Sequence, residues 1–171
     1  MRKKQTQAAR PFVESFAEKA GLNRLKKSDH PRLYYLSGAI TNDPHYKLKF
    51  DLAETYLVAR GDLVVNPVKY ETSGRSWSEY IADDLHTLER MRAAYMAVLP
   101  ILNRISGKPE LRLPCICLID LDDRAFPSKG SELERAFAGD YLPTVKLGEP
   151  WPTLLSEAIA EAEKENGDGL A

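Results

Sequence analysis

The alternation of apolar and polar positions divides the chain into short strands and longer helices. Short apolar runs bounded by glycine, proline or polar residues predict strands at residues 33–37, 62–66, 115–121 and 144–147. Apolar residues repeating every three to four positions predict helices at residues 11–20, 46–59, 131–138 and 152–165. A further helix opens at Ser76, where the spacing to Glu79 fits a capping box, and its pattern continues to about Ile105.

The order of these elements predicts the fold class. Strands that alternate with helices indicate βαβ units, and therefore an α/β protein with a parallel sheet. We expect a three-layer sandwich whose mostly parallel, flavodoxin- or Rossmann-like sheet has four to five strands. A chain of 171 residues fits one domain. Residues 1–30 are expected to form a helical extension, and residues 31–171 the single α/β domain.

Three polar loops mark the place where a ligand would bind. In open parallel sheets, ligands bind at the carboxyl ends of the strands, near the point where the strand order reverses. The segments that follow the first three predicted strands are residues 37–45, 66–75 and 120–130. None of them carries the dinucleotide motif G-x-G-x-x-G, the P-loop G-x-x-x-x-G-K-[ST] or the hydrolase motif G-x-S-x-G.

Composition and charge narrow the classes of partner. Hydrophobic residues make up 43% of the chain, charged residues make up 29%, and the formal net charge is −1. This balance gives no electrostatic reason to expect a nucleic-acid polymer or a membrane as partner. The sequence shows neither an apolar run of about 20 residues nor a signal-peptide pattern. A cytoplasmic protein is therefore expected.

Cysteine and histidine residues are too few and too scattered to predict a metal centre. Cys115 and Cys117 share one face of a predicted strand and are expected to be buried thiols. His30, His45 and His86 have no ligand-like spacing. We expect no metal site and no cofactor.

Glu134 is the first candidate for chemistry. It is predicted to lie in the first turn of the helix after the loop 120–130, where free backbone N–H groups attract anions. The spacing Ser131-x-x-Glu134 also fits a capping box, in which Glu134 would reach back to a backbone N–H. Spacing alone favours the capping interpretation, and a catalytic role for Glu134 stays open beside it.

Two other groups could join Glu134. Tyr35 and its neighbour Tyr34 point to opposite faces of the first strand, and the small-residue turn 37–40 would let a ligand approach the backbone. Tyr35 could equally be a core aromatic residue. Asp83 and Asp84 are expected to favour a helix dipole, but whichever of them faced the cleft would supply a second carboxylate.

Four short motifs, taken in their order and spacing, carry a family resemblance. They are Tyr35-Leu-Ser-Gly-Ala-Ile40, Val65-Asn-Pro67, Ser76-Trp-Ser-Glu-Tyr80 with Asp84-Leu85, and Ser128-x-Gly130-x-x-x-Glu134-x-x-x-Ala138. The chain resembles the nucleoside 2-deoxyribosyltransferase superfamily, including its nucleotide N-glycosidase branch and related uncharacterised phage and bacterial domains. The resemblance extends from about residue 33 to about residue 147.

The resemblance implies covalent catalysis. Glu134 matches the nucleophile that attacks C1′ of the deoxyribose and expels the base, after which a free base or water resolves the glycosyl ester. Tyr35 matches a residue that holds this glutamate, and Asp84 matches one that transfers a proton or positions the base and sugar. A carboxylate nucleophile suits an oxocarbenium-like transition state.

The same resemblance implies a set of substrate-binding residues. These are Ser37, Gly38, Ala39, Asn66, Ser128 and Gly130. Gly38 and Ala39 would line the pocket. Ser128 occupies a position where the nucleotide-specific branch has serine, which can donate to a 5′-phosphate, and Lys129 would reinforce that contact. We therefore expect a nucleoside 5′-monophosphate as substrate.

The sequence leaves several functional alternatives open. The expected activity is cleavage or transfer of an N-glycosidic bond. The sequence decides neither between a transferase and a hydrolase nor between the possible bases. A non-catalytic nucleotide-binding or sensing domain of the same fold is the alternative, whereas a ribosyl-nucleotide hydrolase is disfavoured because its PGGxGTxxE motif is absent. The family implies a homo-oligomer. The chain departs from the family in its long segment 97–113 and in its first 30 residues.

Overall fold

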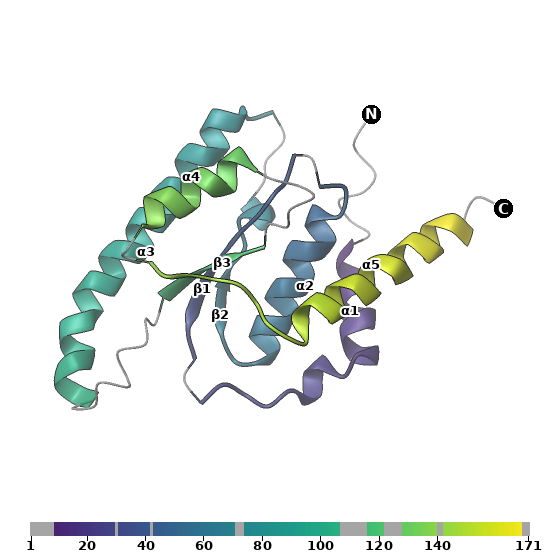
Figure 1. Cartoon of the computed structure of the whole chain (residues 1–171), viewed down its shortest axis with the longest axis horizontal. Helices are drawn as coiled ribbons and strands as arrows, with labels where there is room; N and C mark the ends of the chain where they lie inside the picture. Colours follow the sequence, from purple (N-terminus) through teal and green to yellow (C-terminus); the bar gives the residue numbers. More distant parts are fainter. Residues whose placement is uncertain are drawn as a thin grey trace.

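The computed structural model describes residues 9–29, 31–41, 43–70, 74–106, 116–121, 128–139 and 142–168. In this part of the chain, four strands form one parallel sheet in the order β2-β1-β3-β4 (Figure 1). The strands are β1 (Leu33–Ser37), β2 (Leu63–Val65), β3 (Ile116–Asp120) and β4 (Thr144–Val145). The predicted parallel α/β sheet is therefore confirmed.

Helices cover both faces of the sheet (Figure 1). One face carries α1 (Ala9–Lys19), α2 (Tyr46–Ala59) and α5 (Trp151–Asp168), and the other carries α3 (Trp77–Ser106) and α4 (Lys129–Ala138). Two short 3₁₀ helices, η1 (Leu22–Arg24) and η2 (Pro67–Tyr70), complete the described elements. This arrangement is the expected three-layer sandwich.

The pleat of β1 separates the two cores. Tyr34 and Leu36 pack with α1, α2 and α5, whereas Tyr35 packs with Leu88 and Met91 of α3 and with the end of α4. Successive side chains of a strand point to opposite faces, so neighbouring tyrosines serve different layers, as predicted. The face that carries α3 and α4 has the smaller core, and Tyr35 brings a hydroxyl group into it.

The strand order reverses at β1. From β1 the chain runs through α2 to β2 on one side, and it later passes from β3 through α4 to β4 on the other side. The helix after β1 (α2) and the helix after β3 (α4) lie on opposite faces of the sheet, so the connection changes face between these two neighbouring strands (Figure 1). Such a switch point is where ligands bind in open α/β sheets.

Several boundaries agree with the pattern of the sequence. β1 and α2 have the predicted bounds, and α3 ends at Ser106, close to the predicted end. The capping box is present at the start of α3, where the Ser76 N–H donates to Glu79 Oε2 at 2.6 Å and the Glu79 N–H donates to Ser76 Oγ at 3.4 Å. These elements follow local signals, which explains the agreement.

Other boundaries differ. β2 and β4 are shorter than predicted, because β4 pairs with β3 only at Leu118 and Ile119, and Pro67 begins a 3₁₀ helix directly after β2. The helix α1 begins at Ala9 and α4 begins at Lys129, each two residues before the prediction. The length of a strand depends on how far its neighbouring strand runs beside it, and the sequence of the strand does not identify that neighbour.

Some expectations concern residues outside the described ranges. Cys115, the residues 107–113 and the residues 122–127 lie there, as does the side chain of Cys117. The division into an extension and a domain at residue 30 stays a prediction, although Val13 and Phe16 of α1 pack into the same core as α2 and α5. Among the described helices, none combines the length and apolar character that crossing a membrane requires.

Candidate functional site

Glu134 is the centre of the candidate site. It lies in the second turn of α4, and its side chain is buried against the carboxyl end of β1. The Tyr35 hydroxyl donates to Glu134 Oε1 at 2.9 Å, and the Ser37 hydroxyl donates to Oε2. Both carboxyl oxygens therefore have a hydroxyl donor from one strand.

The capping interpretation of Glu134 is wrong. Ser128 is the N-cap of α4, and its hydroxyl oxygen accepts the Ser131 N–H at 3.3 Å. The helix consequently starts earlier than the sequence predicted, and Glu134 lies one turn beyond the cap. Its carboxyl group faces β1 rather than the N-terminal backbone of its own helix.

The strand periodicity explains why two donors reach the same carboxyl group. Tyr35 and Ser37 are two residues apart on β1, so their side chains lie on one face of the sheet. That face is the one that α4 covers, whereas Tyr34 and Leu36 point into the other core. The start of α4 is fixed by Ser128, and this start decides which turn of α4 meets the strand.

Asp84 of α3 is the third member of the site. Its charge and a side-chain hydrogen bond act on both Tyr35 and Glu134. Burial raises the pKa of Glu134 most, and Asp84 raises it further. The hydrogen bonds from Ser37 and Tyr35 lower this pKa. The resulting pKa of Glu134 is about 8. At neutral pH Glu134 is therefore mostly protonated, and its proton lies in the hydrogen bond with Asp84.

Tyr35 is held in its neutral form. Burial raises the pKa of its hydroxyl far above the usual range, and the charges of Glu134 and Asp84 raise it further. A neutral phenol donates one hydrogen bond and cannot itself act as a base at moderate pH. Its role in this arrangement is to hold Glu134 Oε1 and to stabilise the ionised carboxylate.

The neighbouring Asp83 points elsewhere. Its carboxylate pairs with Arg75 at 2.5 Å on the exposed side of α3, and this ion pair lowers the pKa of Asp83. The sequence offered either aspartate as a second carboxylate for the cleft. The helix turns them about 100° apart, so only Asp84 faces β1 and α4.

Gly38 and Gly130 serve close packing. A Cβ at Gly38 would lie 3.1 Å from Leu121 Cβ and 3.4 Å from the Phe50 ring. A Cβ at Gly130 would lie 3.0 Å from Ile81 Cδ1, so this glycine lets the first turn of α4 approach α3. Glycine at these two positions lets the turn after β1 and the start of α4 pack closely against their neighbours, and this packing does not depend on any contact with a ligand.

The remaining predicted substrate residues are divided between two places. Ala39 is buried in the turn 37–40 after β1 (the β1 turn), and Ser128 lies at the start of α4 near Gly130. Asn66 instead donates to Glu54 of α2 at 2.9 Å, and its side-chain oxygen accepts the Val68 N–H at 3.2 Å. Because α2 and α4 cover opposite faces, the structure does not bring Asn66 to Glu134.

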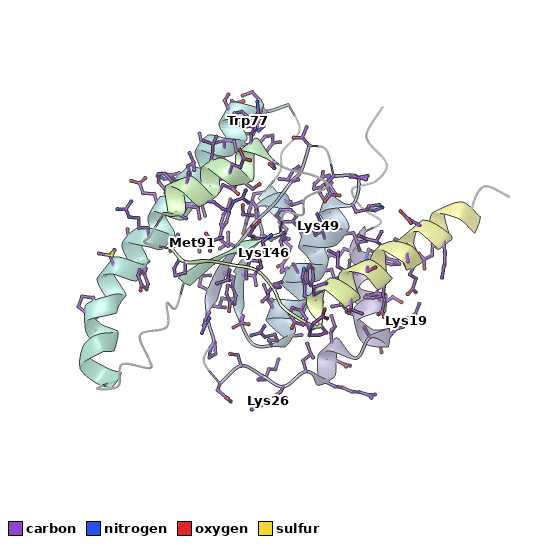
Figure 2. All side chains as sticks on the ribbon, viewed as in Figure 1. Lys19, Lys26, Lys49, Trp77, Met91 and Lys146 are labelled. Carbon is purple, nitrogen blue, oxygen red and sulfur yellow. The ribbon has the colours of Figure 1, made fainter. Side chains whose placement is uncertain are left out.

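Two features of this edge of the sheet were not foreseen. Ser37 was expected to bind substrate, but it contacts Glu134, and its position two residues after Tyr35 was the available signal. Asp43 and Lys49 form a buried ion pair at the start of α2. Lys49 stands among apolar residues of α2, and no local pattern links it to Asp43. Figure 2 shows Lys49 at the end of α2 that lies near the carboxyl edge of the sheet.

Metal coordination has no support in the described part of the chain. No group of three or more His, Cys, Asp and Glu side chains is placed there to hold a metal ion. The site geometry instead offers proton transfer between two carboxyl groups and a buried carboxylate that could attack an electrophilic carbon.

Comparison with known protein families gives a match to part of the chain. The model of a domain of unknown function, DUF4406, matches residues 32–103. The match runs from β1 to near the end of α3 and includes Tyr35, Ser37 and Asp84, whereas Glu134 lies beyond it. No curated protein and no solved structure matches the chain.

Proposed function

We propose that the protein cleaves or transfers the N-glycosidic bond of 2′-deoxynucleosides or their 5′-monophosphates, with Glu134 as the nucleophile. The observation that carries this proposal is the group formed by the buried Glu134 and Tyr35 with the partly buried Asp84 at the switch point of the sheet. Glycosidic cleavage requires two carboxyl groups, one ionised and one that carries a proton. The resemblance to the nucleoside 2-deoxyribosyltransferase superfamily supports the same choice.

The shared proton supplies both the acid and the nucleophile. Transfer of the proton from Glu134 to Asp84 leaves Glu134 ionised. A Glu134 oxygen then forms a bond to C1′ while the bond between C1′ and the base nitrogen breaks, and Asp84 gives its proton to the departing base. A second base completes a transfer: its nitrogen bonds to C1′, the bond between C1′ and Glu134 breaks, and the N–H proton of the base passes to Asp84. Water completes a hydrolysis, in which its proton passes to Asp84 and the Glu134 carboxylate is released.

The 5′-monophosphate is the preferred substrate in this proposal. The Ser128 hydroxyl accepts an N–H through its oxygen, which leaves its proton able to donate to a phosphate. The exposed Lys129 stands beside it at the N-terminus of α4, where a helix favours negative charge. The same proposal includes a cytoplasmic location, where nucleotides are available. It also includes a homo-oligomeric assembly.

An assay of base release tests the activity. The purified protein is supplied with 2′-deoxynucleosides or their 5′-monophosphates, with and without a free acceptor base, and the products are separated by chromatography. We expect turnover that Glu134→Gln abolishes and that Glu132→Gln, an exposed neighbour on the same helix, leaves intact. Mass spectrometry of acid-quenched protein is expected to find a glycosyl adduct on the peptide that contains Glu134.

A non-catalytic nucleotide-binding domain is the second candidate, and one observation favours it. With a pKa of about 8, Glu134 is mostly protonated at neutral pH and is then a weak nucleophile. This candidate predicts nucleotide binding without base release, with or without acceptor, at pH values on both sides of 8. Release of base that depends on Glu134 would exclude it.

A further inference from the structure

Trp77 is a large aromatic side chain exposed beside the candidate site. It is the first residue of α3, and about half of its surface (53%) is accessible. Figure 2 shows it at the end of α3 that adjoins α4. The other tryptophan of the chain, Trp151, is buried and packs at 6.1 Å from the Tyr56 ring. Core packing therefore explains Trp151 but leaves the exposure of Trp77 unexplained.

Gly130 places Trp77 close to Glu134. The position that a Cβ of Gly130 would occupy lies 4.0 Å from Trp77 Nε1 and 3.5 Å from Ser128 Oγ. Gly130 and Glu134 are four residues apart on α4, so they share one face and are separated by about 5–6 Å. Trp77 thus contacts α4 one helical turn before Glu134, beside Ser128, the residue proposed to bind the phosphate.

Gly130 lets the first turn of α4 pack closely against the start of α3. A Cβ there would crowd Ile81 Cδ1 at 3.0 Å and reach ordinary contact with the indole at 4.0 Å. A nucleobase is attached directly to C1′, the atom that Glu134 attacks in the proposed reaction, so the base must lie within a few ångströms of the carboxylate. A planar aromatic side chain that contacts α4 one turn before Glu134 offers a stacking surface for that base.

We propose that Trp77 is the surface on which the nucleobase of the substrate stacks. This inference rests on the proposed function and names the residue that holds its base. Stacking on an aromatic face tolerates different bases, because every base has a π-face. Trp77 therefore contributes affinity for bases in general, and discrimination between bases comes from other contacts.

Binding measurements test this assignment independently of turnover. The four 2′-deoxynucleoside 5′-monophosphates are titrated by calorimetry into the Glu134→Gln protein with Trp77, Trp77→Phe or Trp77→Ala. The base-free 2-deoxyribose 5-phosphate is the matched control ligand. We expect Trp77→Ala to weaken nucleotide binding by about tenfold to a hundredfold, Trp77→Phe to weaken it less, and neither to change binding of the sugar phosphate.

Fluorescence provides a second readout. Because Trp77 and Trp151 are the two tryptophans of the chain, Trp77→Phe leaves only the buried one. Nucleotide is expected to quench the emission of the Trp77 protein and to leave that of Trp77→Phe unchanged. Leu133→Ala, which shortens another exposed apolar side chain at the start of α4, is expected to behave like the parent protein in both measurements.

Each outcome separates this inference from the proposed function. Equal nucleotide affinity in all three proteins, or an equal loss for the sugar phosphate, overturns the stacking role even if base release occurs. Nucleotide binding that depends on Trp77, without base release by the wild type, supports the stacking role and overturns the activity. Absence of nucleotide binding overturns both. A change in oligomeric state caused equally by Trp77→Ala and Leu133→Ala would instead assign the surface to a partner chain.

Discussion

At the scale of single residues, the site is defined by which proton donors reach Glu134. Tyr35 and Ser37 each donate to a different oxygen, and Asp84 competes with them by favouring the protonated form. The carboxyl group is therefore balanced between two protonation states. Hydrogen bonds to a charged group contribute about 1.5–3 kcal/mol each, so losing one donor changes this balance measurably.

Removal of a donor is expected to raise the pKa of Glu134. Tyr35→Phe and Ser37→Ala each delete a hydrogen bond that favours the ionised carboxylate, and each is expected to raise the pKa above 8, by about one unit or more. Carbon-13 NMR of the glutamate carboxyl groups measures this directly. The alkaline limb of base release, where Glu134 and Asp84 lose the proton that the departing base needs, is expected to move to higher pH by the same amount.

A variant on the other face of β1 is the control for this measurement. Tyr34→Phe also removes a tyrosine hydroxyl from β1, but Tyr34 packs in the opposite core. It is expected to leave the Glu134 titration unchanged. A Glu134 pKa that Tyr35→Phe and Ser37→Ala do not move would contradict the hydrogen-bonding scheme.

At the scale of elements, the site depends on how closely α4 and the β1 turn approach their neighbours. The cap at Ser128 sets where α4 begins, and Gly38 sets how closely the β1 turn approaches Leu121 and Phe50. The capping box at Ser76 likewise fixes the start of α3, the helix that carries Asp84. These contacts position the side chains of the site without touching its reacting atoms.

Gly38→Ala is expected to destabilise the fold by overpacking. Its new methyl group would lie 3.1 Å from Leu121 Cβ, which belongs to a buried side chain and cannot move away easily. Overpacking of this kind costs about 1–3 kcal/mol. Urea unfolding measures the loss, and Gly148→Ala is the control because a Cβ there meets nothing within 4 Å. Equal stability of the two variants would refute the packing explanation of Gly38.

Ser76→Ala is expected to lower the free energy of unfolding by about 1 kcal/mol. The change removes the hydroxyl that accepts the Glu79 N–H and donates to Glu79 Oε2, so the start of α3 loses half of its capping box. Thermal unfolding followed by circular dichroism measures the effect. Ser156→Ala, at an exposed position inside α5, is the control and should cost nothing. An undiminished stability of Ser76→Ala would mean that the box is energetically neutral.

At the scale of the whole molecule, burying a titratable group couples the site to global stability. The pKa of Glu134 is about 8 in the folded protein and about 4.5 when exposed, so the native state binds a proton more tightly than the unfolded state. The contribution of the protonated Glu134 to the free energy of unfolding is complete below pH 4.5 and is lost as the pH rises through 8. The fold therefore becomes less stable over this range because it must accommodate a buried charge.

A pH series of unfolding experiments tests this coupling. Between about pH 4.5 and pH 8, the free energy of unfolding of the wild type is expected to fall relative to Glu134→Gln, by up to about 1.4 kcal/mol per pH unit. Urea unfolding at several pH values measures the difference, in which contributions from other groups cancel. Glu132→Gln, whose carboxylate is exposed, should show no such trend. A constant difference for Glu134→Gln would argue against a protonated native Glu134.

The sequence by itself determined the elements and their order. The helices and strands follow periodicity, capping residues and glycine or proline breaks, which act within a few residues, so β1, α2 and the box at Ser76 were predictable. It also marked Tyr35, Asp84 and Glu134, through a resemblance whose functional content stays a proposal.

Only the tertiary structure decided what these residues contact. The spacing of Ser131 and Glu134 supported a cap as well as a catalytic role, and the difference depends on α4 starting at Lys129 beside β1. The choice between Asp83 and Asp84, the donation by Ser37 and the separation of Asn66 from Glu134 likewise depend on which faces of distant elements meet. Contacts between residues about a hundred positions apart are set by packing of the whole core, and no local pattern encodes them.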